Sequence, residues 1–127
     1  MNKLGKLSLC LCLAVGQGTA QARDRRLEPL SQAPGKAAQR GNPYASQPGA
    51  AGAGQKLYER ECSGCHGTAG QGGRRGPAVA SPTVAQSPPG AIFWVLRNGS
   101  LRAGMPSFSH LPEAQRWQIV TYLKSLQ

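Results

Sequence analysis

The chain has 127 residues, of which 39% are hydrophobic, 17 are Gly and 10 are Pro. It is long enough for one modest domain and too short for two domains with independent cores. Its formal net charge of +10 at pH 7 favours contact with anionic surfaces. No apolar run approaches the ~18–20 residues of a membrane-spanning helix, which excludes a protein that crosses the membrane several times.

Residues 1–22 carry the pattern of an export signal. Lys3 and Lys6 precede an apolar stretch over residues 7–15, and a small-x-small triplet follows at 20–22. We predict cleavage after residue 22, since an uncleaved membrane anchor would need a longer apolar run. Cleavage removes two of the 15 basic residues and no acidic one, so the formal charge falls from +10 to +8. It also removes two of the four cysteines, which rules out a disulfide-stapled scaffold.

Residues 23–51 are rich in Pro, Gly, Gln, Ala and Arg and hold few large apolar side chains. Such a segment buries too little surface to offset its backbone entropy, so we predict a disordered linker. It either serves as a spacer or uses its arginines to bind lipid head groups or a partner. The domain is left with residues 52–127, whose core alone supplies no more than ~3–5 kcal/mol, so a further stabilising group is expected.

Helical spacing of apolar residues predicts three helices in this domain, at about 52–62, 91–98 and 111–126. The second ends before Gly99, which suits a helix C-terminus, and the third opens with Pro and Glu, which suit a first turn. Strand-like alternation is absent, so the predicted fold class is all-α. Between the first two helices, residues 67–90 form a 24-residue segment without periodicity, a length expected only where a loop wraps a ligand.

Cys62, Cys65 and His66 form a C-x-x-C-H motif, the attachment signature of a c-type haem. The two cysteines reach the vinyl groups on one edge of the porphyrin, and the next side chain then points at the iron. The motif predicts one haem, covalently attached through Cys62 and Cys65, with His66 as an iron ligand. A thiol redox protein would use the same cysteines, but normally within a strand-rich βαβ pattern. A zinc site would need distant His110 as a fourth ligand, whereas structural zinc sites usually show two spaced ligand pairs.

The second iron ligand is sought among the residues that bind haem iron and follow the export signal. They are Met105, His110, Tyr44, Tyr58 and Tyr122. A single Met often only fills a core, but Met105 lies in a loop between the second and third helices that can fold over the far face of the ring. We predict Met105 as the ligand. His110 is the rival, although its neighbours indicate a surface position.

In this order and spacing, the residues resemble class I c-type cytochromes, in particular the small single-haem bacterial kind. The resemblance spans about residues 54–126 and implies a compact cytochrome c fold of three or more helices around one haem. It rests on Gly54 with Tyr58 and Tyr122, the motif at 62–66, Arg75-Gly76-Pro77, Asn98-Gly99, Met105-Pro106 and the terminal run 117–126. The resemblance further implies that the Pro77 carbonyl accepts the His66 ring N–H and that Gly54 allows a close approach to Tyr122.

With His66 and Met105 both on the iron, no coordination position is open to oxygen, peroxide or substrate, so we predict an electron carrier and not an enzyme. Glu59, Glu61 and Glu113 are expected on solvated helix faces. The predicted function is that of a periplasmic cytochrome that shuttles single electrons between respiratory or dehydrogenase partners. The alternative is a haem-bearing subunit of a dehydrogenase or oxidase complex. A peroxidase or gas sensor would require the methionine to be displaced.

Basic residues flank the segments expected to border the haem, which predicts redox partners with acidic docking surfaces. They are Arg74, Arg75, Arg97, Arg102, Lys56 and Lys124. Nucleic acid is not an expected partner, because the basic residues are scattered and few aromatic residues interleave with them. We expect no small-molecule substrate and contact with the membrane only through partners.

Overall fold

A computed structural model describes residues 25–127, so the predicted export signal lies outside the described residues. This part of the chain is helical and contains no β-strand, which confirms the all-α prediction. The 3-10 helices are η1 (Arg25–Gln32) and η2 (Leu101–Ala103). The α-helices are α1 (Gly35–Ala38), α2 (Ala50–Glu61), α3 (Ser63–His66), α4 (Pro82–Gln86), α5 (Pro89–Asn98) and α6 (Glu113–Ser125). Within the described range, every helix is too short or too polar to cross a membrane.

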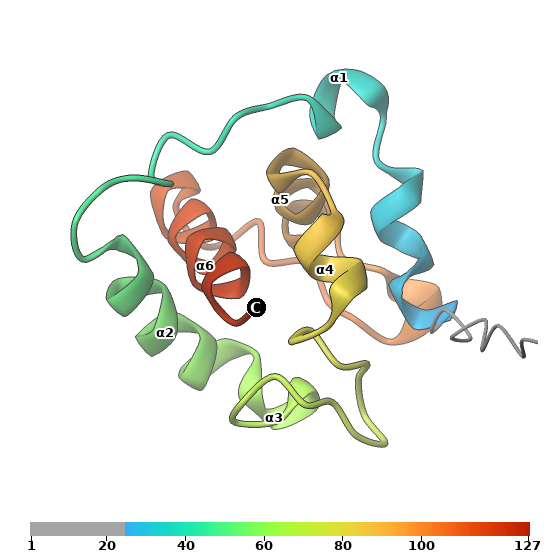
Figure 1. The fold of residues 1–127 in the computed structure, drawn as a ribbon. Coiled ribbons are helices and arrows are strands. Elements are labelled where there is room, and N and C mark those ends of the chain that lie inside the picture. The colour runs from blue at the N-terminus through green and yellow to red at the C-terminus, as the bar shows by residue number, and fades with distance from the viewer. Residues whose placement is uncertain (1–24) are drawn as a thin grey trace, which may run out of the picture.

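The first and last long helices, α2 and α6, lie against each other across one side of the molecule (Figure 1). Gly54 makes this approach possible: a Cβ there would lie 2.9 Å from the Tyr122 Cβ and closer still to the Gln118 carbonyl. The rings of Tyr58 and Tyr122 pack at 5.3 Å between centroids. The close approach of Gly54 to Tyr122 is therefore confirmed.

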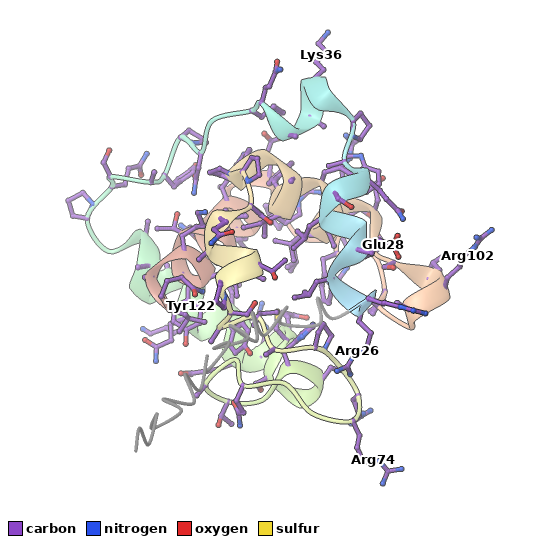
Figure 2. All side chains as sticks on the ribbon, turned by 45° about the vertical axis from the view of Figure 1, so that its right-hand side comes forward. Arg26, Glu28, Lys36, Arg74, Arg102 and Tyr122 are labelled. Carbon is purple, nitrogen blue, oxygen red and sulfur yellow. The ribbon has the colours of Figure 1, made fainter. Side chains whose placement is uncertain are left out.

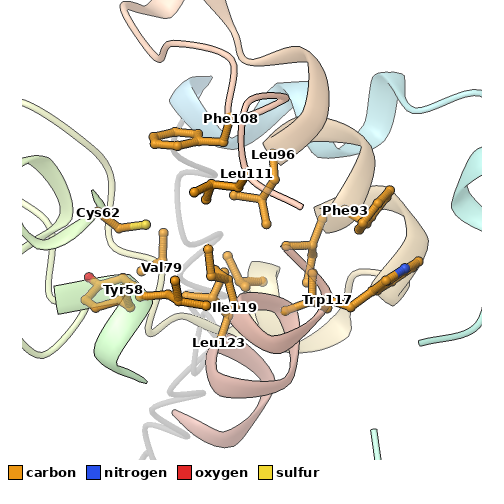
Figure 3. Close-up of a cluster of buried hydrophobic side chains, with 14 residues drawn as sticks. Tyr58, Cys62, Val79, Phe93, Leu96, Phe108, Leu111, Trp117, Ile119 and Leu123 are labelled. Carbon is orange, nitrogen blue, oxygen red and sulfur yellow. The ribbon is translucent and has the colours of Figure 1, made fainter. Parts of the chain in front are cut away.

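The core lies between α2, α5 and α6 and is drawn in Figure 3. Phe93 of α5 stacks on Trp117 of α6 with ring centroids 4.0 Å apart. Ile119 and Val120 of α6 are fully buried. The three predicted helices correspond to α2, α5 and α6, with ends shifted by no more than two residues.

The prediction that residues 67–90 lack regular structure needs correction, because α4 lies within them. The Ser81 hydroxyl accepts a hydrogen bond from the Val84 amide at 3.5 Å, and Pro82 occupies the first turn. Val84 is only 2% exposed and belongs to the core. A helix of five residues is too short to show a periodic pattern, although the Ser-Pro start signal is visible in the sequence.

The predicted disordered linker also needs correction, because residues 25–51 carry η1, α1 and the first two residues of α2. Leu27 and Leu30 pack against the core, and the Arg40 guanidinium lies 2.7 Å from the Glu113 carboxylate. With so few large apolar side chains, the segment cannot build a core of its own. It packs instead on apolar surface that the rest of the chain provides.

Candidate functional site

The C-x-x-C-H residues form one helical turn, α3, directly after α2. The amides of Cys65 and His66 donate to the Cys62 carbonyl at 3.1 and 3.0 Å. The turn ends at Gly67, whose φ of +82° favours glycine and whose carbonyl accepts the Tyr58 hydroxyl at 2.6 Å. Cys62 is buried and Cys65 is exposed, and both are free thiols.

The His66 ring is oriented by the loop that follows α3. Its Nδ1 lies 2.9 Å from the Pro77 carbonyl oxygen. A carbonyl can only accept, so Nδ1 carries the proton and Nε2 keeps its lone pair for a metal. Gly76 lets the backbone come this close, since a Cβ there would lie 3.0 Å from the same Nδ1. The contact implied by the resemblance is thus present in the structure.

Met105 lies in the loop after α5, and backbone hydrogen bonds hold it there. The amides of Ser100 and Met105 each donate to the other residue's carbonyl, at 2.9 and 3.0 Å. The Phe108 amide donates to the Leu96 carbonyl at 2.8 Å, which ties the end of the loop back to α5. Gly99 starts the loop with a φ of +70°, and a Cβ there would lie 2.7 Å from the Met105 carbonyl oxygen. The methionine is half-buried at a fixed position.

A mainly apolar cavity is bounded by α3 and by the Met105 loop. About 1030 Å³ of space is free of protein atoms here, part of it open to solvent. Cys62, Cys65, His66 and Met105 all line it. Its apolar walls are formed by Leu27, Leu30, Val79, Val84, Ile92, Val95, Leu96, Phe108 and Leu123. The structure therefore brings the four predicted binding residues, together with Pro77, around one space.

The rival iron ligands are placed less favourably. His110 is exposed and does not line the cavity, and its ring lies against Phe108 at 5.9 Å. Tyr44 and Tyr122 do not line it either. Tyr58 does, but burial raises its pKa to about 12, so the phenol keeps its proton.

The thiol redox and zinc hypotheses also lose support. Burial, with a smaller effect of the Glu61 charge, raises the pKa of the Cys62 thiol to about 12. Reactive cysteines have instead a pKa of roughly 3.5–7.5. Within residues 25–127 no three His, Cys, Asp or Glu side chains are grouped to hold a metal ion.

The acidic residues differ in their surroundings. Glu59 is exposed and accepts a hydrogen bond from Gln55 at 3.0 Å. Glu113, also exposed, pairs with Arg40. Glu61 departs from the expectation: it is half-buried, lies 2.7 Å from the Arg60 guanidinium and lines the edge of the cavity.

Residues 49–123 match the family model described as cytochrome c oxidase, cbb3-type, subunit III. The chain belongs to this family. It is a small c-type cytochrome, a family that implies haem c and a role in electron transfer. The cytochrome is similar in fold to cytochrome cL from the marine methylotrophic bacterium Methylophaga aminisulfidivorans MPT. The TM-score is 0.59 at 22% sequence identity, and the match covers 87% of this chain and 71% of that chain. No curated protein matches the sequence.

The residues of this cytochrome fit a haem. Two thiols and an oriented imidazole stand on one wall of an apolar cavity, and a thioether stands in the loop that forms another. The contribution of η1 to this cavity was not predicted from the sequence. Leu27 and Leu30, three positions apart in an otherwise polar segment, were the signal that could have revealed it.

Proposed function

We propose that the cytochrome carries single electrons through one haem bound covalently by Cys62 and Cys65, with His66 and Met105 as the iron ligands. The observation that supports this most is the convergence of these four side chains on a single apolar cavity. When bound, the haem supplies a one-electron couple, because its iron changes between the ferric and ferrous states.

The protein residues have separate tasks in this proposal. The Pro77 carbonyl fixes the orientation of the His66 ring and increases its basicity through the hydrogen bond to Nδ1. The thioether of Met105 favours a higher reduction potential than a second nitrogen ligand would. If His66 and Met105 both bound the iron, the protein would leave no ligand position for oxygen, peroxide or substrate. This supports an electron carrier over an enzyme.

The proposed compartment is the periplasm. The export pattern at residues 1–22 and membership of a c-type cytochrome family both support it.

The proposed partners are redox proteins with acidic surfaces. Arg74 and Arg102 are exposed, and Figure 2 shows them projecting along one side of the molecule. Next to Arg102, Leu101 is 79% exposed and adds an apolar contact point within the Met105 loop. These features support fast, salt-sensitive docking on this side.

The remaining basic residues contribute unequally to this surface. Arg75 lines the cavity, and Arg97 is exposed at the end of α5, where its carbonyl accepts from the Ser107 hydroxyl of the Met105 loop, so both are included in the proposed docking surface. Lys56 is exposed on α2 and does not line the cavity. The half-buried Lys124 donates to the carbonyls of Ala85 and Ser87, so its charge is engaged at the end of α4 and is omitted from the docking surface.

One observation favours a second candidate function. The family description names a subunit of an oxidase, so a haem-bearing subunit of a larger complex is the alternative to a diffusing carrier. Isolation from native membranes separates the two. A carrier is released as a single chain, whereas a subunit co-purifies with its complex.

The experiment that tests the proposed function is the visible spectrum of full-length protein produced with a c-haem assembly system, together with a haem-stained denaturing gel. Covalent haem, low-spin bands and the weak long-wavelength band of thioether-bound iron are expected. A high-spin spectrum would show that Met105 does not bind the iron, and would favour a function in ligand binding or catalysis. Absence of haem would overturn the proposal and return Cys62 and Cys65 to thiol chemistry.

A further inference from the structure

Residues 25–48, here called the N-terminal strap, precede the region that matches the family model. Figure 1 shows the strap rising beside α5 as η1, turning at α1 and crossing the top of the molecule to reach α2. The family match therefore says nothing about what this segment does.

One end of the strap forms part of the cavity. Leu27, Pro29 and Leu30 of η1 line the same space as His66 and Met105. Both leucines are half-buried and pack against the core. The Arg26 guanidinium donates to the Gly73 carbonyl at 3.0 Å. This bond joins the strap to the loop that runs from the haem-binding motif to Pro77.

The middle of the strap is packed tightly on α5. The backbone of Ala37 and Ala38 lies so close to Gly90 that a Cβ there would come within 2.6 Å of the Ala38 carbonyl oxygen. Any side chain at position 90 would force the two segments apart. The strap therefore uses a contact that only glycine permits.

The far end of the strap is anchored on α6. Arg40 pairs with Glu113 at 2.7 Å and lies over the Phe93 ring at 4.9 Å. The Asn42 amide donates to the Thr121 hydroxyl at 2.9 Å. These anchors lie outside the cavity lining, so they hold the strap without depending on a bound group.

We propose that the strap is a structural part of the haem site, in which Leu27 and Leu30 cover the haem and keep water from it. This rests on the proposed haem binding described above. An apolar wall disfavours the more highly charged ferric state, so it raises the reduction potential. It also obstructs the approach of small external ligands to the iron on the side that the strap covers.

The test uses full-length holoprotein with the double substitution Leu27→Ser and Leu30→Ser. Ser31→Ala with Gln32→Ala is the matched control, because these residues of the same helix are exposed and do not line the cavity. The measurements are the midpoint potential by spectroelectrochemical titration and the rate at which cyanide displaces Met105 from the ferric iron. We expect a lower midpoint and several-fold faster cyanide binding in the double variant, and wild-type values in the control. The single substitutions Leu27→Ala and Leu30→Ala give smaller shifts in the same direction and serve if the double variant fails to fold.

The outcomes separate this proposal from the one on which it rests. A wild-type protein without haem overturns the proposed function and the role of the strap with it. A wild-type haem protein whose midpoint and cyanide-binding rate are unchanged in the leucine variants overturns the role of the strap alone. Equal shifts in the control and the double variant also overturn it, because the effect would then come from the helix and not from its apolar face.

Discussion

The His66 Nδ1 donates to the Pro77 carbonyl across 2.9 Å, and the absence of a side chain at Gly76 makes this distance possible. Eleven positions separate the two partners in the sequence, and the intervening loop folds back so that Gly72 donates to the His66 carbonyl at 2.7 Å. His66 is thus held through both its ring and its backbone carbonyl. The loop between the motif and Pro77 acts as a clamp on the predicted iron ligand.

We predict that Gly76→Ala weakens this clamp. The new Cβ would lie 3.0 Å from Nδ1, so the loop must move and the hydrogen bond to Pro77 lengthens. A less basic imidazole stabilises the ferric state less, so the midpoint potential of the holoprotein should rise. Gly73→Ala is the matched control, since a Cβ there meets nothing within 4 Å. A midpoint equal to that of the wild type in both variants would contradict the role assigned to the bond.

We predict that Met105→Ala opens the second axial position. The long-wavelength thioether band should disappear, the midpoint potential should fall, and the reduced protein should bind carbon monoxide. His110→Ala is the control, because His110 is exposed and outside the cavity lining. If the histidine variant lost the low-spin spectrum and the methionine variant kept it, the ligand assignment would be reversed.

We predict an acid-sensitive contribution from the pair between Arg40 and Glu113. The hydrogen bond from Arg40, followed by that from the Trp117 indole, lowers the pKa of the Glu113 carboxyl from its ordinary value of 4.5. A carboxyl whose pKa is lower in the folded state contributes stability above pH 4.5, and loses it as the pH falls through the folded-state pKa. Both side chains are largely exposed, so the effect is small and screened by salt.

Thermal unfolding measured from pH 7 to pH 3 checks this contribution. Relative to the wild type, Glu113→Gln should lower the unfolding temperature at neutral pH, and the difference should shrink below pH 4.5. Arg40→Ala should remove most of the pH-dependent part. Any decrease in unfolding temperature that Arg40→Ala still causes at low pH reports the loss of its packing on Phe93. A wild-type minus Glu113→Gln difference that grew on acidification would contradict the assigned direction of the pKa shift.

Some parts of the fold could be predicted from the sequence because a particular residue type, at a particular spacing, can serve only one structural purpose. The motif of Cys62, Cys65 and His66 predicts its own geometry, and Gly54, through the resemblance to class I cytochromes, predicts the close approach to Tyr122. The strap was not predictable, because its leucines gain their burial from α5 and the cavity and not from neighbours in sequence. The role of Lys124 was hidden for a similar reason. Its partners are carbonyls 37 and 39 positions away, so a charge count could not reveal that its ammonium is engaged.

We predict that Gly54→Ala destabilises the fold, because it forces α2 away from α6. The added Cβ would lie 2.9 Å from the Tyr122 Cβ and closer still to the Gln118 carbonyl, which is backbone and cannot turn aside. Overpacking of this kind costs about 1–3 kcal/mol. Gly52→Ala lies on the same helix with nothing within 4 Å of its Cβ, so it should leave stability unchanged or raise it by about 0.5–1 kcal/mol. Chemical denaturation of both variants, followed by circular dichroism, gives the two free energies. Equal values would mean that the two helices separate at no cost and that the crossing does not depend on glycine.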